Sequence, residues 1–122
     1  MDTASIFKKV IMEALKYFKN KKAEFASNAF IREDAIAFCK RLYKLGATNI
    51  DIAFDEELLE DGEELEEIYA DSMLVSFPKN LGKRLDIAVA IFEWRPDEVS
   101  ADSVYDRKVN WRKDKSVFLW WD

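Results

Sequence analysis

The chain has 122 residues, 49% of them hydrophobic and 35% charged, and its net charge at neutral pH is −5. This composition is typical of one folded domain with a hydrophobic core, and no apolar run approaches the roughly 18 residues of a membrane-spanning helix. With no histidine and a single cysteine, the sequence excludes serine–histidine and cysteine–histidine catalytic pairs, zinc sites built on histidine or several thiolates, and an internal disulfide.

Residues 1–54 predict two helices and a strand. Apolar residues recur every three or four positions over residues 6–18 and again over residues 31–45, which predicts two amphipathic helices. Gly46 is expected to end the second helix in a left-handed conformation. Residues 49–54 alternate between large apolar and polar or small side chains, which predicts a strand with one buried face.

Residues 72–122 predict two further strands around a third helix. Residues 72–77 form a short strand pattern, and residues 116–121 are apolar on both faces, which favours a central or covered strand. Between them, residues 80–94 predict a well-buried helix, and residues 104–111 are compatible with one more strand. The stripe expected to face the core consists of Leu81, Leu85, Ala88, Val89 and Phe92, widened by Ile87 and Ile91.

The resulting order, α-α-β-β-α-β, predicts an α+β fold for a single globular domain spanning residues 1–122. Mixed elements in small numbers are expected to form two layers. One layer is a small, mostly antiparallel sheet of three or four strands, and the other consists of about three helices packed on it.

The location is predicted from two further features of the sequence. Lys8, Lys9 and Glu13 interrupt the apolar residues near the N-terminus, which is not the pattern of a secretory signal. Cys39 lies in a helical pattern beside Phe38 and is expected to be a small buried residue in a reducing compartment. Both features favour the cytoplasm.

The most unusual segment is the acidic connection, residues 55–71, with the sequence DEELLEDGEELEEIYAD. Ten of its 17 residues are acidic and none is basic, so it holds more negative charge than the net −5 of the whole chain. Leucines, Ile68 and Tyr69 are interleaved with the acids, which favours a segment held against the fold with its carboxylates displayed outward. The alternative interpretation is a solvated connection between two strands.

A calcium site in the acidic connection is a further alternative. An EF-hand loop aligned on Gly62 would need oxygen ligands at positions 57, 59 and 61 and a glutamate at position 68. Glu57 and Asp61 meet this pattern, whereas positions 59 and 68 are leucine and isoleucine. The specific motif fails, a looser carboxylate site stays open, and no metal or cofactor is expected.

A second pattern lies in residues 96–108. Pro96-Asp97 is followed after eight residues by Asp106-Arg107-Lys108, which is similar to the signature of metal-dependent nucleases. That resemblance implies two carboxylates holding Mg²⁺ and a lysine that positions or activates water. It covers only 13 residues, and the acidic balance of the chain opposes nucleic-acid binding. A nuclease or hydrolase using Asp97, Asp106 and Lys108 is therefore the alternative function.

The preferred hypothesis is a non-enzymatic, acidic protein-binding module, and one concrete version is an immunity or inhibitor protein that neutralises a basic toxin or nuclease. Charge would steer a basic protein partner, and interleaved apolar or aromatic groups would slow its dissociation. No nucleic-acid or membrane partner is expected, and the sequence leaves the oligomeric state open. The residues expected to contact the partner are Asp55, Glu56, Glu57, Glu60, Asp61, Glu63, Glu64, Glu66, Glu67 and Tyr69.

Overall fold

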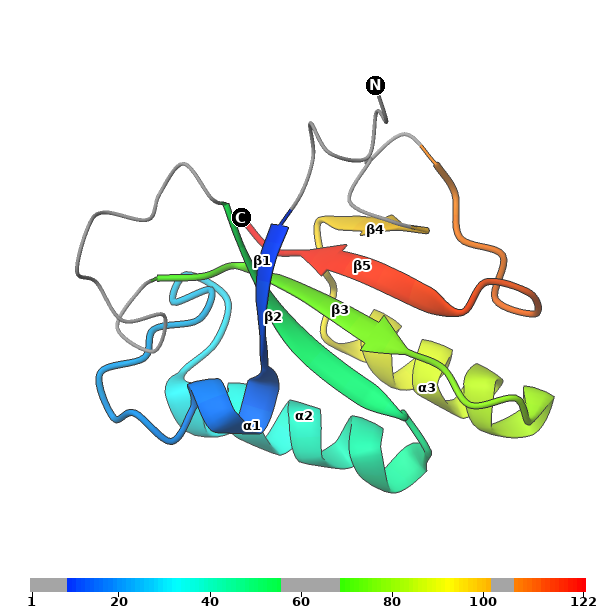
Figure 1. Ribbon diagram of the computed structural model, residues 1–122, viewed down its shortest axis with the longest axis horizontal. Coiled ribbons are helices and arrows are strands. Elements are labelled where there is room, and N and C mark those ends of the chain that lie inside the picture. Colours follow the sequence, from blue (N-terminus) through cyan, green and yellow to red (C-terminus); the bar gives the residue numbers. More distant parts are fainter. Residues whose placement is uncertain (1–8, 56–68, 102–106) are drawn as a thin grey trace.

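The structure is a computed structural model that describes residues 9–55, 69–101 and 107–122 (Figure 1). Five antiparallel strands form one sheet in the spatial order β1-β2-β3-β5-β4. The strands are β1 (Lys9–Glu13), β2 (Asn49–Asp55), β3 (Ser72–Ser76), β4 (Glu98–Ser100) and β5 (Ser116–Trp120). The helices are α1 (Ala14–Tyr17), α2 (Arg32–Leu45) and α3 (Leu81–Glu93). They pack on one face of the sheet, so the predicted α+β class is confirmed, with five strands rather than three or four.

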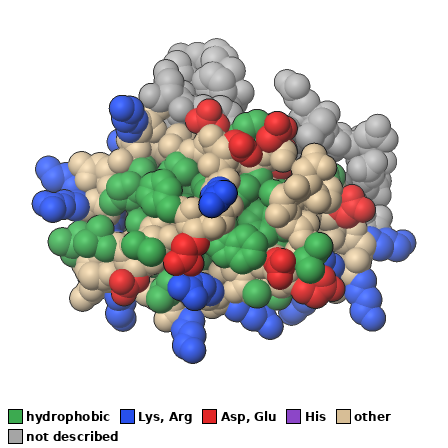
Figure 2. Space-filling view, turned by 180° about the vertical axis from the view of Figure 1, so that it is seen from behind, with side chains coloured by type: hydrophobic (Ala, Val, Ile, Leu, Met, Phe, Trp, Pro, Cys, Tyr) green, Lys and Arg blue, Asp and Glu red, His purple; other side chains and the backbone are tan. Residues whose placement is uncertain are grey.

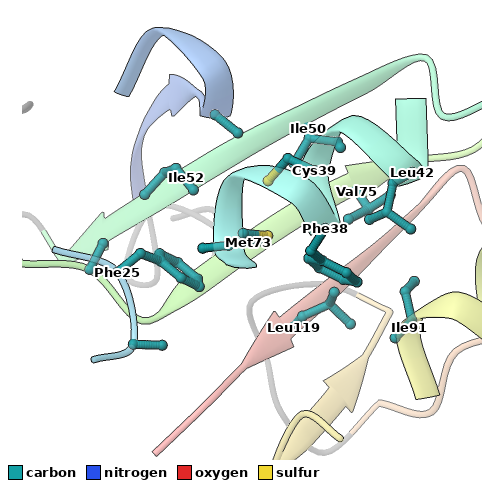
Figure 3. Close-up of a cluster of buried hydrophobic side chains, with 14 of the residues drawn as sticks. Phe25, Phe38, Cys39, Leu42, Ile50, Ile52, Met73, Val75, Ile91 and Leu119 are labelled. Carbon is teal, nitrogen blue, oxygen red and sulfur yellow. The ribbon is translucent and has the colours of Figure 1, made fainter. Parts of the chain in front are cut away.

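The core between the helices and the sheet is rich in aromatic side chains. Register brings apolar residues of neighbouring strands together on the helix side, so Met73 of β3 lies between Ile52 of β2 and Leu119 of β5. Phe38 and Leu42 of α2 and Ile91 of α3 close over them (Figure 3). Burying large apolar side chains of this kind supplies about 1.5–3 kcal/mol each, which makes this layer the main source of stability.

Cys39 is fully buried in this core, as predicted. Burial raises the pKa of its thiol to about 12, and the Glu13 carboxylate adds to that effect. The thiol therefore stays protonated at neutral pH and acts as a small apolar side chain.

The first predicted helix is wrong over residues 9–13, which form the edge strand β1. Its register pairs Met12 with Ile52 of β2, and Met12 packs against the core. The apolar residues of this segment fit a strand as well as a helix, and β-branched Val10 and Ile11 favour the strand. The helix that remains, α1, is a single turn that begins after Glu13.

The extra strand compatible with residues 104–111 is also corrected. Residues 102–106 lie outside the described part of the chain, and residues 107–111 are not in a strand. The additional strand is β4, which pairs with β5 through Val99 and Leu119. This strand can be only three residues long because it pairs with the longer strand β5 along its whole length.

The helix α2 ends as the sequence indicated. Gly46 has φ of 117° and donates its amide hydrogen to the last turn of the helix. A side chain at this position would be strained by that backbone angle and would meet Cδ of Lys83 at 3.0 Å.

The orientation of α3 is the largest difference from the sequence prediction. Ile87, Ala90 and Ile91 face the core, together with Arg84, which is 5% exposed. Ile87 and Ile91, which were expected to widen the buried stripe, are buried, but of its five main members only Ala88 is buried. The other four members form the α3 apolar stripe on the outer side of the helix: Leu81, Leu85, Val89 and Phe92.

A hydrogen-bond network joins β1, α2 and β2. The hydroxyl of Tyr43 donates to Oε2 of Glu13 at 2.5 Å and accepts from the amide of Ile50 at 3.0 Å. Partial burial raises the pKa of Glu13, but hydrogen bonds from Tyr43, Leu15 and Lys16 outweigh it and hold the pKa below its usual value. The same network, with burial as the larger cause, raises the pKa of Tyr43 to about 12.

Replacing Tyr43 by phenylalanine is expected to lower the free energy of unfolding by about 1–3 kcal/mol at neutral pH, because both partners lose a hydrogen bond. The depressed pKa of Glu13 gives the native state stability that is present above the ordinary value of 4.5 and is lost as the pH falls through the lower native value. In urea unfolding experiments, the difference in the free energy of unfolding between wild type and Tyr43→Phe should therefore become smaller as the pH falls below the native pKa of Glu13. Glu13→Gln lacks the titrating group, and an acid dependence as steep as wild type in that variant would contradict this assignment.

Candidate functional site

The acidic connection joins the neighbouring antiparallel strands β2 and β3. Asp55 is the last residue of β2, and Ser72 is the first residue of β3. Eight of the ten residues predicted to contact a partner lie between positions 56 and 67, outside the described residues. The structure describes Tyr69 and the backbone of Asp55, so it fixes where the connection starts and ends.

The C-terminal end of the acidic connection is fastened to the body of the protein. The amide of Ala70 donates to the carbonyl of Glu24 at 3.0 Å, and the amide of Ala26 donates to the carbonyl of Ala70 at 2.7 Å. The carbonyl of Asp71 accepts from the amide of Trp121 at 3.0 Å. These bonds hold the last two residues of the acidic connection beside the aromatic core.

Tyr69 is the aromatic residue of the predicted set, and 38% of it is exposed. Partial burial raises its pKa, and the negative charge of Asp71 raises it further. The phenol thus stays neutral at physiological pH and presents an aromatic ring beside acidic residues. An exposed tyrosine of this kind is a common anchor in protein interfaces because it is large, rigid and amphipathic.

The α3 apolar stripe is a surface that the sequence prediction placed in the core. Its residues are 44–59% exposed, and Phe92 stands against Trp111 with 5.4 Å between ring centroids. Hydrophobic side chains reach the surface on the half of the molecule that carries α3, with charged groups among them (Figure 2). An ion pair between Arg41 of α2 and Glu93, 3.8 Å long, borders the helix. Exposed apolar residues spaced along three turns are typical of a surface that contacts another protein.

The residues of the nuclease-like pattern do not form a complete site in the described structure. Asp97 follows α3 and lies beside the end of β5, where its amide donates to the carbonyl of Trp120 at 2.8 Å. Its Oδ2 accepts from the amide of Asp122 at 2.7 Å, so part of the carboxylate already has a structural role. Lys108 is exposed, and Asp106 lies outside the described residues. Within residues 9–55, 69–101 and 107–122, no cluster of three acidic or cysteine side chains could hold a metal ion.

The tryptophans at the C-terminus belong to the fold, as expected. Trp121 is buried, and Trp120 is half-buried at the end of β5. Phe118, on the face of the sheet away from the helices, is also buried, which confirms that β5 is covered on both faces. In the described part of the chain, no helix is long and apolar enough to cross a membrane.

Sequence reasoning missed one further feature, a cluster of basic side chains around a pocket at the other end of the sheet. Its members come from three separate segments, the connection between β3 and α3, α3 itself and the turn before β5. Only the pairing of β3 with β5 brings these segments together, so no local pattern could have indicated the pocket.

Comparisons with protein-family models, curated proteins and solved structures found no match to this chain.

Proposed function

We propose that the protein is a non-enzymatic binding module whose acidic connection captures a basic protein partner. The observation that carries the proposal is the concentration of ten acidic residues and no basic residue in 17 positions. A field of this density raises the rate of encounter with a cationic protein and makes that rate depend on salt.

The described structure supports the proposal by the way the ends of the connection are held. Asp55 ends β2, which is paired on both sides in the sheet, and Ala70 is hydrogen-bonded on both its amide and its carbonyl. Charges that start and end at fixed points lose less conformational entropy on binding than charges on a free tail. Tyr69 adds an exposed ring at one of these points, suited to slow dissociation once a partner has arrived.

The α3 apolar stripe is a second surface suited to a protein partner. Leu85 and Val89 are its central members, 45% and 59% exposed. Covering such residues would contribute about 25 cal/mol per Å² of apolar surface removed from water, a contribution that salt does not weaken. Electrostatic attraction would then govern arrival of the partner, and apolar contact would govern its retention.

A concrete form of this function is an immunity or inhibitor protein that covers the active site of a basic toxin or nuclease. Enzymes that bind nucleic acid carry clustered basic residues, and those residues are complementary to an acidic surface. A metal-dependent nuclease using Asp97, Asp106 and Lys108 would instead lose its Mg²⁺-dependent activity on Asp106→Ala, whereas a binding module would keep its partner.

Affinity capture from the native host tests the proposal. The enriched protein is expected to be basic, and high salt is expected to release more of it than low salt. The double variant Leu85→Gln/Val89→Gln should release the same partner about tenfold faster or more, because truncating central apolar contacts acts mainly on dissociation. The control is Ile11→Gln/Ile31→Gln, which changes two exposed apolar residues elsewhere on the protein.

Two outcomes would count against parts of this account. If the enriched protein is acidic, or is equally retained at both salt concentrations, the electrostatic proposal is wrong. If the α3 variant and its control release the partner at the same rate, the α3 apolar stripe lies outside the interface.

A further inference from the structure

A basic pocket lies where β2 begins, β3 ends and β5 begins. Figure 1 shows that this end of the sheet is opposite the end at which Asp55 completes β2 and Ser72 starts β3. Its volume is about 520 Å³, within the range of small-molecule sites. Three hydroxyl-bearing residues line it, Thr48, Ser76 and Ser116. The basic residues that line it are Lys79, Arg84, Arg112, Lys113 and Lys115, and the described lining contains no carboxylate.

The walls of the basic pocket are fixed by the buried guanidinium of Arg84. Its Nε donates to the carbonyl of Trp111 at 2.8 Å, one terminal nitrogen donates to Pro78 at 3.3 Å, and the other donates to the carbonyl of Asp114. The guanidinium also lies 4.7 Å from the centre of the Phe77 ring. Arg84 thus ties the connection after β3 to the turn before β5.

The turn that carries Arg112 and Lys113 is held by its own side chains. The Oδ1 atom of Asn110 accepts from the amides of Arg112 and Lys113 at 3.1 and 3.2 Å, and Oδ2 of Asp114 accepts from the amide of Asn110 at 2.6 Å. The other carboxylate oxygen of Asp114 pairs with Arg107 at 3.1 Å. The turn is therefore ordered before any ligand arrives, which lowers the entropic cost of binding there.

The charge of the basic pocket is poorly compensated within the described structure. In the described structure, Arg84 donates to neutral carbonyls, and the Asp114 carboxylate instead accepts from Arg107 and from the amide of Asn110. Lys79, Lys113 and Lys115 are exposed around the rim. Several like charges close together repel one another, so a bound anion would gain attraction and relieve that repulsion.

We propose that the basic pocket binds the polyphosphate group of a small molecule. One phosphate carries about 1.5–2 negative charges at neutral pH, so two or more phosphates match the four exposed basic side chains, Lys79, Arg112, Lys113 and Lys115, better than one. Lysine, arginine and hydroxyl groups are the side chains that hold phosphate oxygens. The small extent of the pocket favours a small ligand over a nucleic-acid strand, which would need a longer basic track. An open hollow of about 600 Å³ beside α1 mixes Lys16 and Lys19 with Glu13 and lacks this charge bias.

An NMR titration of the full chain with inorganic pyrophosphate at low ionic strength tests the proposal. Saturating shifts are expected for the backbone amides of Ser76, Lys79 and residues 112–116. The double variant Lys113→Gln/Lys115→Gln should bind at least about tenfold more weakly, because each lost contact is a charge-assisted hydrogen bond. Lys21→Gln/Lys22→Gln removes two equally exposed lysines from a distant turn and should bind like wild type.

The same titration separates the possible ligands. Weaker binding of orthophosphate than of pyrophosphate supports a polyphosphate ligand, and equal binding contradicts it. Tighter binding of a single-stranded oligonucleotide or of a glutamate-rich peptide than of pyrophosphate would overturn the proposal in favour of a macromolecular ligand. Shifts that never saturate, or equal affinity in both double variants, would show that no pyrophosphate site exists. Lys79→Gln/Arg112→Gln repeats the test with the two exposed basic side chains that the first variant leaves in place, without changing Arg84.

Discussion

Replacing Trp121 by alanine is expected to lower the free energy of unfolding by about 3–5 kcal/mol, the range for removing a large aromatic side chain from a core. Trp121 is 1% exposed. Its ring lies edge-on to the rings of Phe25, Phe30 and Phe38, at centroid distances of 5.6, 5.1 and 5.9 Å. The variant therefore leaves a cavity that three rigid rings cannot close.

A polar contact adds to the expected effect. The indole N–H of Trp121 donates to the carbonyl of Trp94 at 3.0 Å, which links the end of the chain to the end of α3. Trp121→Phe keeps most of the volume and loses this bond, so its cost should be smaller, about 1–2 kcal/mol. Urea unfolding at neutral pH measures the loss in the free energy of unfolding for each of the two variants. A loss below about 1 kcal/mol in Trp121→Ala would show that the aromatic cluster is not central to the fold.

The sequence was most informative where pattern and end signals agree. The helix α2, the strands β2 and β3, and the last strand β5 lie where periodicity and alternation indicated. For α2, apolar periodicity, acidic residues in the first turn and Gly46 after the last turn all specify the same element. Where local preferences agree with the global fold in this way, one sequence is enough to predict the element.

The face of α3 could not be predicted because apolar residues surround most of the helix. Periodicity alone allows either Leu85 and Val89 or Ile87 and Ile91 to face inward. The buried face also carries Arg84, whose guanidinium reaches carbonyls of Pro78, Trp111 and Asp114. Two of these partners are 27 and 30 residues away in sequence, so only the folded chain reveals the contacts that accompany this orientation of the helix.

The first strand was missed for a related reason. A segment of five residues with mixed apolar and charged side chains carries little periodic information, and its pairing with β2 decides its conformation. The basic pocket was missed because its residues are far apart in the sequence and come together only in the folded chain.

Conversely, the acidic connection was evident in the sequence, whereas the structure describes its two ends but not residues 56–68.

The two charged regions occupy opposite ends of the same pair of strands. The acidic connection follows Asp55 and precedes Ser72, whereas Thr48 and Ser76 at the other end of β2 and β3 line the basic pocket. We infer that this separation would orient an approaching basic protein, because one end attracts it and the other repels it. Phosphate bound in the basic pocket would weaken that repulsion.

The most direct measurement is the association rate of the captured partner as a function of ionic strength. We predict that Glu63→Gln/Glu64→Gln/Glu66→Gln/Glu67→Gln slows association about 10- to 100-fold at low salt and flattens its salt dependence, because steering is lost. The matched control, Glu33→Gln/Asp86→Asn/Glu93→Gln/Glu98→Gln, removes the same charge from exposed positions outside the connection and its anchoring hydrogen bonds. It should change the rate much less. Equal association rates and equal salt slopes in the two variants would contradict the claim that the acidic connection is the capture surface.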